Sequence, residues 1–528
     1  MKREKLQDAV GMIGDDLIEE AASYKKKRNR LRWIPAVAIL LCISILMGVV
    51  ALRPKEESMP ETPIDQNLPE TPIDQNLLTD NAGDDAEVNE QESATDISGN
   101  KHYYNLDYCM KKAVYPERVL NYSLNADLND PEAYNKWQND RDSFREAYDS
   151  DTPDLSKFIK YSTKAFLADT EDNAIYSPVN VYMALAMLAE TSAGESRAQI
   201  LNALGSDSID ELRADANSLW KALYTDDGTA KTILANSLWL REEGEYKSEP
   251  LEILAENYYA STFEGRMGSK EYDEVLRGWL NEQTDGMLTD QVKGIGLPEE
   301  TVLALASTIL FNGKWSEEFN PERNRERVFH GTDGKVTTEF MNESTNGSIS
   351  VGDNFTAYKK YFTENGHMTF ILPKEGMTPQ ELIATDEFAE FVLCGGRDSY
   401  MSDLTDKPCW DSERRAIINF SMPKFDVSSQ LDLTEDLGKL GITDITDEIK
   451  ANMSPITDAG AFLDTMVHGA RVTVDEKGCK AAAFTMMICG ATSAPLDEIN
   501  FVLDRPFVFV IGGYDGLPLF IGTVNNVK

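Results

Sequence analysis

The sequence has few of the residues that build metal centres or disulfide scaffolds. Its 528 residues include six cysteines and four histidines, and they contain neither an HExxH nor a CxxC motif. So few cysteines in so long a chain do not form a disulfide framework. No glycine-rich nucleotide fingerprint follows a strand, and no phosphate loop is present. We therefore expect no metal and no cofactor.

Positive charge is also scarce. The chain has 51 Lys and Arg against 90 Asp and Glu, a formal net charge of −39. This balance argues against nucleic acid or anionic lipid as the main partner, because phosphates repel such a surface. Hydrophobic residues make up 41% of the chain, enough for most of it to bury a core.

One long uncharged run lies near the N-terminus. Residues 33–52 (WIPAVAILLCISILMGVVAL) carry no charge over 20 residues, and residues 25–32 before them carry six basic side chains. That length can cross a bilayer as a helix, and the basic flank favours a cytoplasmic N-terminus. We predict a cytoplasmic tail (1–32) and a transmembrane signal anchor (33–52). A cleaved signal peptide and a lipoprotein anchored at Cys42 are the alternatives.

The next hundred residues differ from a folded domain. The motif PETPIDQNL occurs twice in tandem, at 60–68 and 69–77. The surrounding tract, residues 54–100, is acidic and has Lys55 as its only basic residue. Such a tract cannot bury enough apolar surface to fold. Residues 53–100 are therefore interpreted as a tether. Residues 101–154 are aromatic-rich and polar, and the sequence does not decide whether they fold alone or pack on the next domain.

From residue 155 onward the pattern is that of a large α+β domain. Helical spacing appears over 154–170, Ser177 and Pro178 form a helix start, and a further helix over 196–204 ends at Gly205. Helices and strands come in blocks, which favours extended antiparallel sheets. Short runs rich in β-branched and aromatic residues predict strands at 233–240, 302–311, 368–373, 416–425 and 506–513.

Five segments in this domain resemble one family, the serpins, and they occur in the family's order. They are YSPVNVYMALAMLAETSAGESRAQILNALG (176–205), LASTILFNGKWSEEFNP (305–321), INFSMPKFDVSSQLDLTEDLGKLGITDIT (418–446), VHGARVTVDEKGCKAAAFT (467–485) and LDRPFVFVIGGYDGLPLFIGTVNN (503–526). The resemblance implies a serpin domain over 155–528, with three β-sheets, surrounding helices and an exposed reactive-centre loop. It also implies an inhibitor of serine proteases and not an enzyme.

The resemblance further implies where the main sheet opens. The residues at that point are Ser177, Asn180, Ser307 and Trp315. The family usually has a serine where Asn180 stands and an asparagine where Ser307 stands, so the resemblance implies an exchange of the two polar side chains between these positions.

In such an inhibitor, a protease cuts the reactive loop, which then inserts into the sheet as a new strand. Insertion excludes proline and buried charge, and residues 481–494 (AAAFTMMICGATSA) contain neither. Strand alternation puts Cys479, Ala481, Ala483, Thr485 and Met487 on one face and Lys480 on the other. The expected hinge is Glu476, Gly478, Cys479, Ala481, Ala482 and Ala483, although the family usually has a small hydroxyl residue where Cys479 stands and often a glutamate where Lys480 stands.

By the family's spacing from Glu476, the bond cut by the protease is Thr492–Ser493, with Ala491–Thr492 and Ser493–Ala494 as alternatives. No Lys or Arg occurs between 481 and 504, which argues against trypsin-like targets. The small residues favour an elastase-like protease, followed by subtilisin-like or papain-like ones.

The cysteines of the domain leave their redox states undecided. Cys394 and Cys409 could pair across a loop. Cys479 and Cys489 flank the inserting segment, but in an extended strand they would lie about 33 Å apart, beyond disulfide reach, so two separate thiols are favoured. His468 is interpreted as a packed structural residue, because no nucleophile motif accompanies it.

Two functions compete. The first is a suicide-substrate inhibitor tethered at the plasma membrane, single-pass, with the serpin domain outside. The second is a non-inhibitory, serpin-like binding module whose loop never inserts. Ala481, Ala482 and Ala483 favour the first, whereas Cys479 and Lys480 weaken it.

Overall fold

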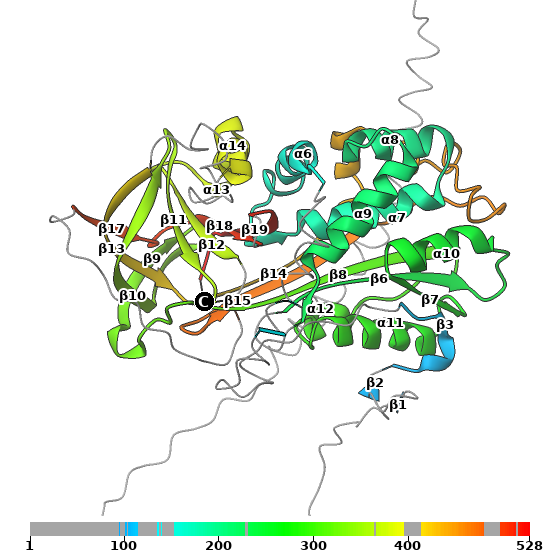
Figure 1. Cartoon of the computed structure of the whole chain (residues 1–528), viewed down its shortest axis with the longest axis horizontal. Coiled ribbons are helices and arrows are strands. Elements are labelled where there is room, and N and C mark those ends of the chain that lie inside the picture. The colour runs from blue at the N-terminus through cyan, green and yellow to red at the C-terminus, as the bar shows by residue number, and fades with distance from the viewer. Residues whose placement is uncertain are drawn as a thin grey trace, which may run out of the picture. The chain divides into compact units, whose positions relative to one another are not determined.

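Figure 1 shows a computed structural model of the chain. The chain divides into two units, residues 1–87 and 88–528, and everything described below belongs to the second. The segments predicted as cytoplasmic tail and membrane anchor, and most of the tether, lie outside the described residues. Among the helices of the described part, none has the length and apolar character needed to cross a membrane. The described residues are 94–95, 101–102, 104–113, 135–136, 139, 153–226, 231–363, 366–394, 413–479, 497–513 and 516–527.

Local capping chemistry defines the helix ends. The Ser177 hydroxyl accepts a hydrogen bond from the Asn180 amide at 3.2 Å, and Pro178 occupies the first position of α7. Helix α8 ends at Gly205, whose φ is +80°, and it begins two residues earlier than predicted. The helices are α6 (Ser156–Leu167), α7 (Pro178–Thr191), α8 (Gly194–Leu204), α9 (Ile209–Leu223), α10 (Ser248–Asn257), α11 (Lys270–Gln283), α12 (Thr289–Val292), α13 (Pro379–Ile383) and α14 (Asp386–Cys394), with 3₁₀ turns η1 (Leu106–Tyr108), η2 (Pro321–Arg323) and η4 (Asp436–Leu440).

A six-stranded sheet is built around two long strands. Strand β6 pairs antiparallel with β8 and parallel with β7, so the strands predicted at 233–240 and 302–311 are confirmed. Along β6, Leu234 and Leu238 enter one hydrophobic cluster while Ala235 and Trp239 enter another, which shows that both faces are covered. The order is β16 (Gly478–Cys479), β8 (Leu303–Lys314), β6 (Lys231–Arg241), β7 (Ala260–Gly265), β3 (Cys109–Lys111), with β5 (Thr225–Asp226) paired to β6.

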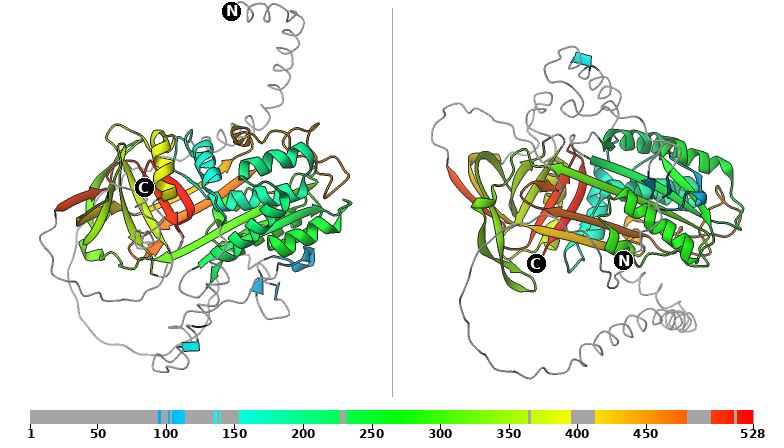
Figure 2. Two further views of the ribbon diagram at one scale, coloured as in Figure 1. Left: turned by 45° about the horizontal axis from the view of Figure 1, so that its top comes forward. Right: turned by 90° about the horizontal axis from the view of Figure 1, so that it is seen from below.

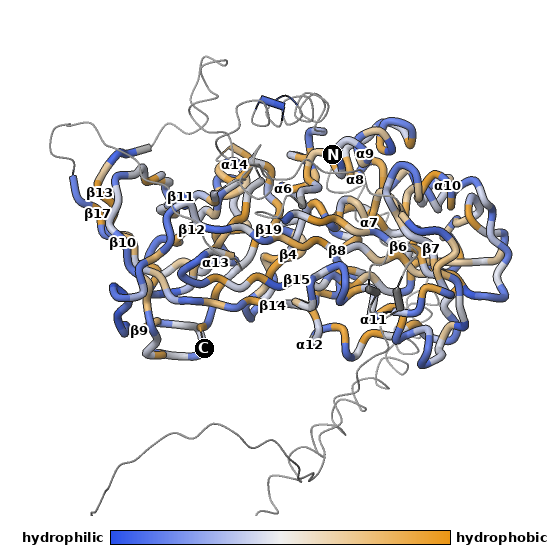
Figure 3. Tube along the Cα trace, turned by 60° about the horizontal axis from the view of Figure 1, so that its bottom comes forward, coloured by the Kyte–Doolittle hydropathy of each residue, from blue (hydrophilic) through white to orange (hydrophobic). Residues whose placement is uncertain are grey.

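Helices cover the two faces of this sheet. Figures 1 and 2 show α7 and α9 on one side of β6 and β8, and α11 on the other. Helix α7 is buried along almost its whole length. In Figure 3 the hydrophobic stretches gather along β4, β6, β8 and β19. The main core therefore lies between α7 and the strands.

A nine-stranded sheet forms the other half of the domain. Its longest strand, β10, pairs with β9 at one end, with β13 along its middle and with β11 at its other end. The strands predicted at 368–373 and 506–513 are confirmed as β12 and β18, which pair antiparallel. The order is β17 (Glu498–Val502), β13 (Glu413–Pro423), β10 (Gly334–Val351), β11 (Phe355–Tyr361), β12 (His367–Pro373), β18 (Phe507–Gly512), β19 (Pro518–Val524), β4 (Ala174–Tyr176), with β9 (Arg325–Gly331) beside β10.

Two further strands form a ribbon of their own. Strands β14 (Phe425–Asp432) and β15 (Val467–Val474) pair antiparallel over their whole length. The strand predicted at 416–425 is confirmed as far as Pro423, where β13 ends, and β14 begins in a different sheet at Phe425. Proline lacks the amide hydrogen that a ladder needs. A small separate pair, β1 (Ala94–Thr95) and β2 (Lys101–His102), precedes the domain.

Part of the aromatic-rich segment packs on the domain. Strand β3 adds to the free edge of β7, and the Ala113 amide donates to the Ser261 hydroxyl at 3.0 Å. The Tyr104 ring lies 5.7 Å from that of Phe263. Residues 104–113 thus belong to the fold and extend the six-stranded sheet, although the segment that resembles the family begins only at about residue 155.

Candidate functional site

The candidate hinge leaves β15 through a tight turn. The Asp475 carboxylate accepts hydrogen bonds from the amides of Lys477 and Gly478 at 2.8 and 3.2 Å. The Asp475 amide donates to the Gly478 carbonyl at 3.1 Å. An aspartate that bonds the backbone two and three residues ahead fixes a turn of this kind. The chain therefore reverses direction after β15.

Strand β16 follows this turn and pairs antiparallel with the end of β8. Gly478 lies opposite Lys314, and Cys479 lies opposite Gly313. Gly478 has φ +145°, and a Cβ atom there would lie 2.4 Å from the Gly313 carbonyl oxygen. Only glycine adopts this conformation at such a close approach. The predicted hinge glycine is thus required where the chain enters the sheet.

Among the described residues, the edges of β8 and β15 next to β16 have few strand partners. Within the described residues, β8 is paired with β6 on one edge and only with the two residues of β16 on the other. Strand β15 is paired with β14 alone, and Asp475 at its end forms one bridge to Gly478. Unpaired strand edges carry rows of hydrogen-bonding groups that can accept another strand.

Trp315, which the sequence analysis placed in the sheet-opening region, fixes the hinge to the end of β8. Its indole nitrogen donates to the Asp475 carbonyl at 3.0 Å, and its backbone amide donates to the Lys477 carbonyl at 3.0 Å. The ring is buried and stacks on Phe362 with centroids 4.7 Å apart. Trp315 therefore holds the turn through both its side chain and its backbone amide.

Glu476 forms an ion pair beside the hinge. Its carboxylate lies 2.7 Å from the Lys424 ammonium, which also lies 2.7 Å from Glu339, and it accepts a hydrogen bond from Asn324 at 2.7 Å. Burial works against ionisation, but the bonds from Lys424 and Asn324 hold the pKa of Glu476 below its ordinary value. The pair thus stabilises the hinge above the ordinary pKa of glutamate and weakens as the pH falls through the lowered one.

A second ion pair lies deeper, beneath Trp315. The Lys360 ammonium is 2.5 Å from the Glu343 carboxylate, and both side chains are almost fully buried. It also lies 4.5 Å from the Phe319 ring centroid and 5.6 Å from that of Trp315, within cation–π range. Burial lowers the pKa of Lys360, and Glu343 opposes that shift. Nothing in the local sequence distinguished this lysine from its neighbour Lys359.

The polar residues of the predicted sheet-opening point meet in the structure. The Asn180 side-chain amide, on α7, donates to the Ser307 hydroxyl, on β8, at 3.1 Å. Ser177 caps the helix one turn earlier. A hydrogen bond between these two polar side chains therefore joins α7 to β8.

His468 completes this cluster from β15. Its Nε2 accepts a hydrogen bond from the Ser177 amide at 3.1 Å, and its ring meets Tyr176 edge-on at 5.9 Å. Complete burial lowers the pKa of His468 to about 4. The neutral, packed role predicted for this histidine agrees with its place in the fold.

The thiol chemistry is partly resolved. Cys479 is buried and free, and burial raises the pKa of its thiol to about 12. Cys394 is disulfide-bonded. Cys409, Cys489, the hinge alanines and all four candidate residues of the reactive bond (491–494) lie outside the described residues. Among those described, no group of side chains could hold a metal ion.

Comparisons with known proteins agree with this geometry. A family model described as "Serpin (serine protease inhibitor)" matches residues 158–527. Alpha-1-antitrypsin 1-3 of Mus musculus is 28% identical over 366 residues, a match covering 67% of this chain and 83% of the relative. Serpin-ZX of Arabidopsis thaliana is 26% identical over 377 residues, covering 67% and 91%.

Solved structures show the same arrangement of sheets and helices. The native state of the thermophilic serpin tengpin superposes with a TM-score of 0.61 at 27% identity, covering 71% of this chain and 93% of that one. The native stressed conformation of Arabidopsis AtSerpin1 gives a TM-score of 0.58 at 25% identity, covering 73% and 98%. The fold class predicted from the sequence is confirmed.

Proposed function

The chain belongs to the serpin family of serine protease inhibitors, and on that premise we propose that it traps its target protease by loop insertion. The observation that carries the proposal is the position of β16. Gly478 and Cys479 already form the first two rungs of a strand beside β8. The adjoining edges of β8 and β15 have no other ladder partner among the described residues.

Extending the register of β16 shows which residues of the loop would face which residues of β8 after insertion. If the ladder continued beyond Cys479, Ala481 would lie opposite Phe311, Ala483 opposite Ile309 and Thr485 opposite Ser307. Ile309 and Phe311 contact the core beneath α7. The inserted strand would therefore place only small side chains on the face that packs beneath α7, while Lys480 would point to the opposite face.

The target proposed from the loop composition is an elastase-like serine protease. The reactive bond is Thr492–Ser493, or one of its two neighbours, and the surrounding residues suit a small, shallow specificity pocket. Subtilisin-like serine proteases and papain-like cysteine proteases are the next candidates.

We further propose that inhibition takes place at the plasma membrane. The uncharged run 33–52 and the basic residues before it support a single-pass anchor with a cytoplasmic N-terminus. The acidic, proline-containing stretch 53–100 would then hold the inhibitory domain outside, away from the bilayer.

Incubation of the purified protein with elastase tests the mechanism. We expect a covalent complex that survives SDS, with the cut bond located by mass spectrometry. Ala483→Glu should turn the protein into a substrate, because insertion would bury the new charge. Ala482→Glu is the matched control, since its side chain would share the face that already carries Lys480.

Cleavage of the unmodified chain without complex formation would refute the proposal and favour the non-inhibitory binding module. The same conclusion would follow if cleavage left the melting temperature unchanged. Equal inhibition by the two variants would show that the loop does not enter the sheet in the register of β16.

A further inference from the structure

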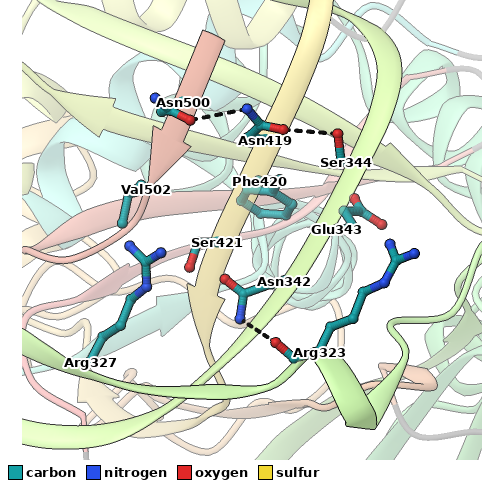
Figure 4. A pocket seen from close by; sticks show the side chains of 10 residues that line it. All are labelled: Arg323, Arg327, Asn342, Glu343, Ser344, Asn419, Phe420, Ser421, Asn500 and Val502. Atoms are coloured by element: carbon teal, nitrogen blue, oxygen red, sulfur yellow. Dashed lines mark hydrogen bonds between the residues drawn. The ribbon is translucent and has the colours of Figure 1, made fainter. Parts of the chain in front are cut away.

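A polar pocket lies on the nine-stranded sheet and has no part in loop insertion. Its volume is about 540 Å³. The floor comes from β10, β13 and β17, and two arginines stand at its side, Arg323 from η2 and Arg327 from β9 (Figure 4). A pocket of this size suits a small-molecule ligand.

The strand register explains why the floor is polar. Two rows of paired residues cross the strands, Asn342–Ser421–Val502 and Ser344–Asn419–Asn500. Side chains two residues apart along a strand share a face, so these six lie together. Glu343 and Phe420 also line the pocket, but strand alternation directs their side chains toward the opposite face, where Glu343 pairs with Lys360.

Hydrogen bonds within the floor leave mainly donors available. The Ser344 hydroxyl donates to the Asn419 carbonyl oxygen at 2.8 Å, and the Asn419 amide donates to the Asn500 carbonyl oxygen at 3.1 Å. That relay leaves the amide group of Asn500 for a ligand. The Asn342 amide is used by the backbone carbonyls of Arg323 and Phe340.

Ser421 gives an independent indication of a ligand. It is 4% exposed, and its hydroxyl has no hydrogen-bond partner within the part of the chain described. Figure 4 shows it between Arg327 and Asn342. Burying a hydroxyl without a partner is costly, so a ligand that supplied a hydrogen-bond partner to Ser421 would gain affinity from it.

The charge in the pocket is positive and uncompensated. Among the described residues, neither Arg323 nor Arg327 takes part in an ion pair, although the chain as a whole carries a formal charge of −39. The one carboxylate beside the pocket, Glu343, is neutralised by Lys360. Two guanidinium groups that flank one pocket from different sides (Figure 4) favour an oxyanion, which a guanidinium can bind in a bidentate manner.

We propose that this pocket binds a small polyhydroxylated molecule that carries an oxyanion, either a sugar phosphate or a sugar carboxylate. Arg323 and Arg327 hold the oxyanion. The Asn500 amide and the Ser421 hydroxyl bind the sugar hydroxyls. This site is separate from the reactive loop, so an experiment that refutes the inhibitory mechanism would leave this proposal unaffected.

Isothermal titration of the full-length protein with glucose 6-phosphate, glucuronate and glucose tests the site. We expect saturable binding of at least one of the two anions and none of glucose. The tighter anion identifies the group as phosphate or carboxylate. Arg323→Gln with Arg327→Gln should weaken binding at least tenfold, whereas Arg414→Gln with Arg415→Gln, an equal loss of charge farther along β13, should change it less than twofold.

Ser421→Ala separates ligand binding from a structural role. Because this hydroxyl bonds nothing within the described residues, its removal should leave the melting temperature unchanged or higher, while the affinity for the anion falls three- to tenfold. The proposal is overturned if neither anion binds at 10 mM, if glucose binds as well as they do, or if the arginine and serine variants bind like the unmodified protein.

Discussion

The hinge glycine offers a direct test of how the loop enters the sheet. In Gly478→Ala, the new Cβ would meet backbone atoms of β8, namely the Gly313 oxygen at 2.4 Å, the Lys314 Cα at 2.8 Å and the Trp315 nitrogen at 3.0 Å. These are backbone atoms at the end of β8, and they cannot move aside as a flexible side chain could. The two residues of β16 must therefore leave the ladder.

The size of the effect follows from the conformation. A residue other than glycine at such a φ costs about 1–3 kcal/mol, before the overlap with the carbonyl oxygen is counted. An increase of about 2 kcal/mol in the free energy of the closed hinge raises the population of the open one about 30-fold. Cys479, which follows Gly478, reports this opening because it is 2% exposed and free.

Alkylation by iodoacetamide at pH 8, followed by peptide mass mapping, measures the accessibility of the Cys479 thiol alone. We expect its rate to rise about 30-fold or more in Gly478→Ala. Gly469→Ala, in the neighbouring strand β15, is the matched control, since no atom lies within 4 Å of the added methyl group. An unchanged rate at Cys479 in Gly478→Ala would refute the pairing of β16 with β8.

Three further predictions concern the buried polar groups. The pKa of His468 is about 6.5 when unfolded and about 4 when folded, so its stabilising effect is complete above pH 6.5 and is lost as the pH falls toward 4. Urea unfolding should show this histidine's contribution reduced by about 2 kcal/mol at pH 5, and NMR should show its ring still neutral there. Lys360→Met should cost about 3–5 kcal/mol, because Glu343 is left buried without a partner, and adding Glu343→Leu should restore most of it; chemical denaturation measures both. Asn180→Ala should cost about 1–2 kcal/mol by removing the bond to Ser307, whereas the exchange Asn180→Ser with Ser307→Asn should unfold at nearly the original denaturant concentration.

Local chemistry was readable from the sequence. Ser177 followed by Pro178 predicted the start of α7, and the glycine at 205 predicted the end of α8, because caps depend on a few adjacent residues. The strand predicted at 416–425 ends earlier, at Pro423, for a tertiary reason. Lys424 turns out of the ladder to meet Glu476 and Glu339, and the chain changes sheets there.

Features that join distant segments were not readable. Asn180 and Ser307 are 127 residues apart, so the sequence suggested their exchange but could not establish the bond. Lys360 follows another lysine and resembles a solvated surface pair until Glu343 is brought against it. The oxyanion pocket is assembled from several strands and a turn, and each strand alone has the composition of an ordinary sheet surface.

The short strand β3 has a practical consequence for anyone who produces this protein. A recombinant fragment trimmed to the family match would begin near residue 158 and lack Cys109–Lys111. Strand β7 would then present a bare row of amides and carbonyls, and bare edges recruit other chains. Such a fragment should aggregate at concentrations where a fragment beginning before Tyr104 stays monomeric.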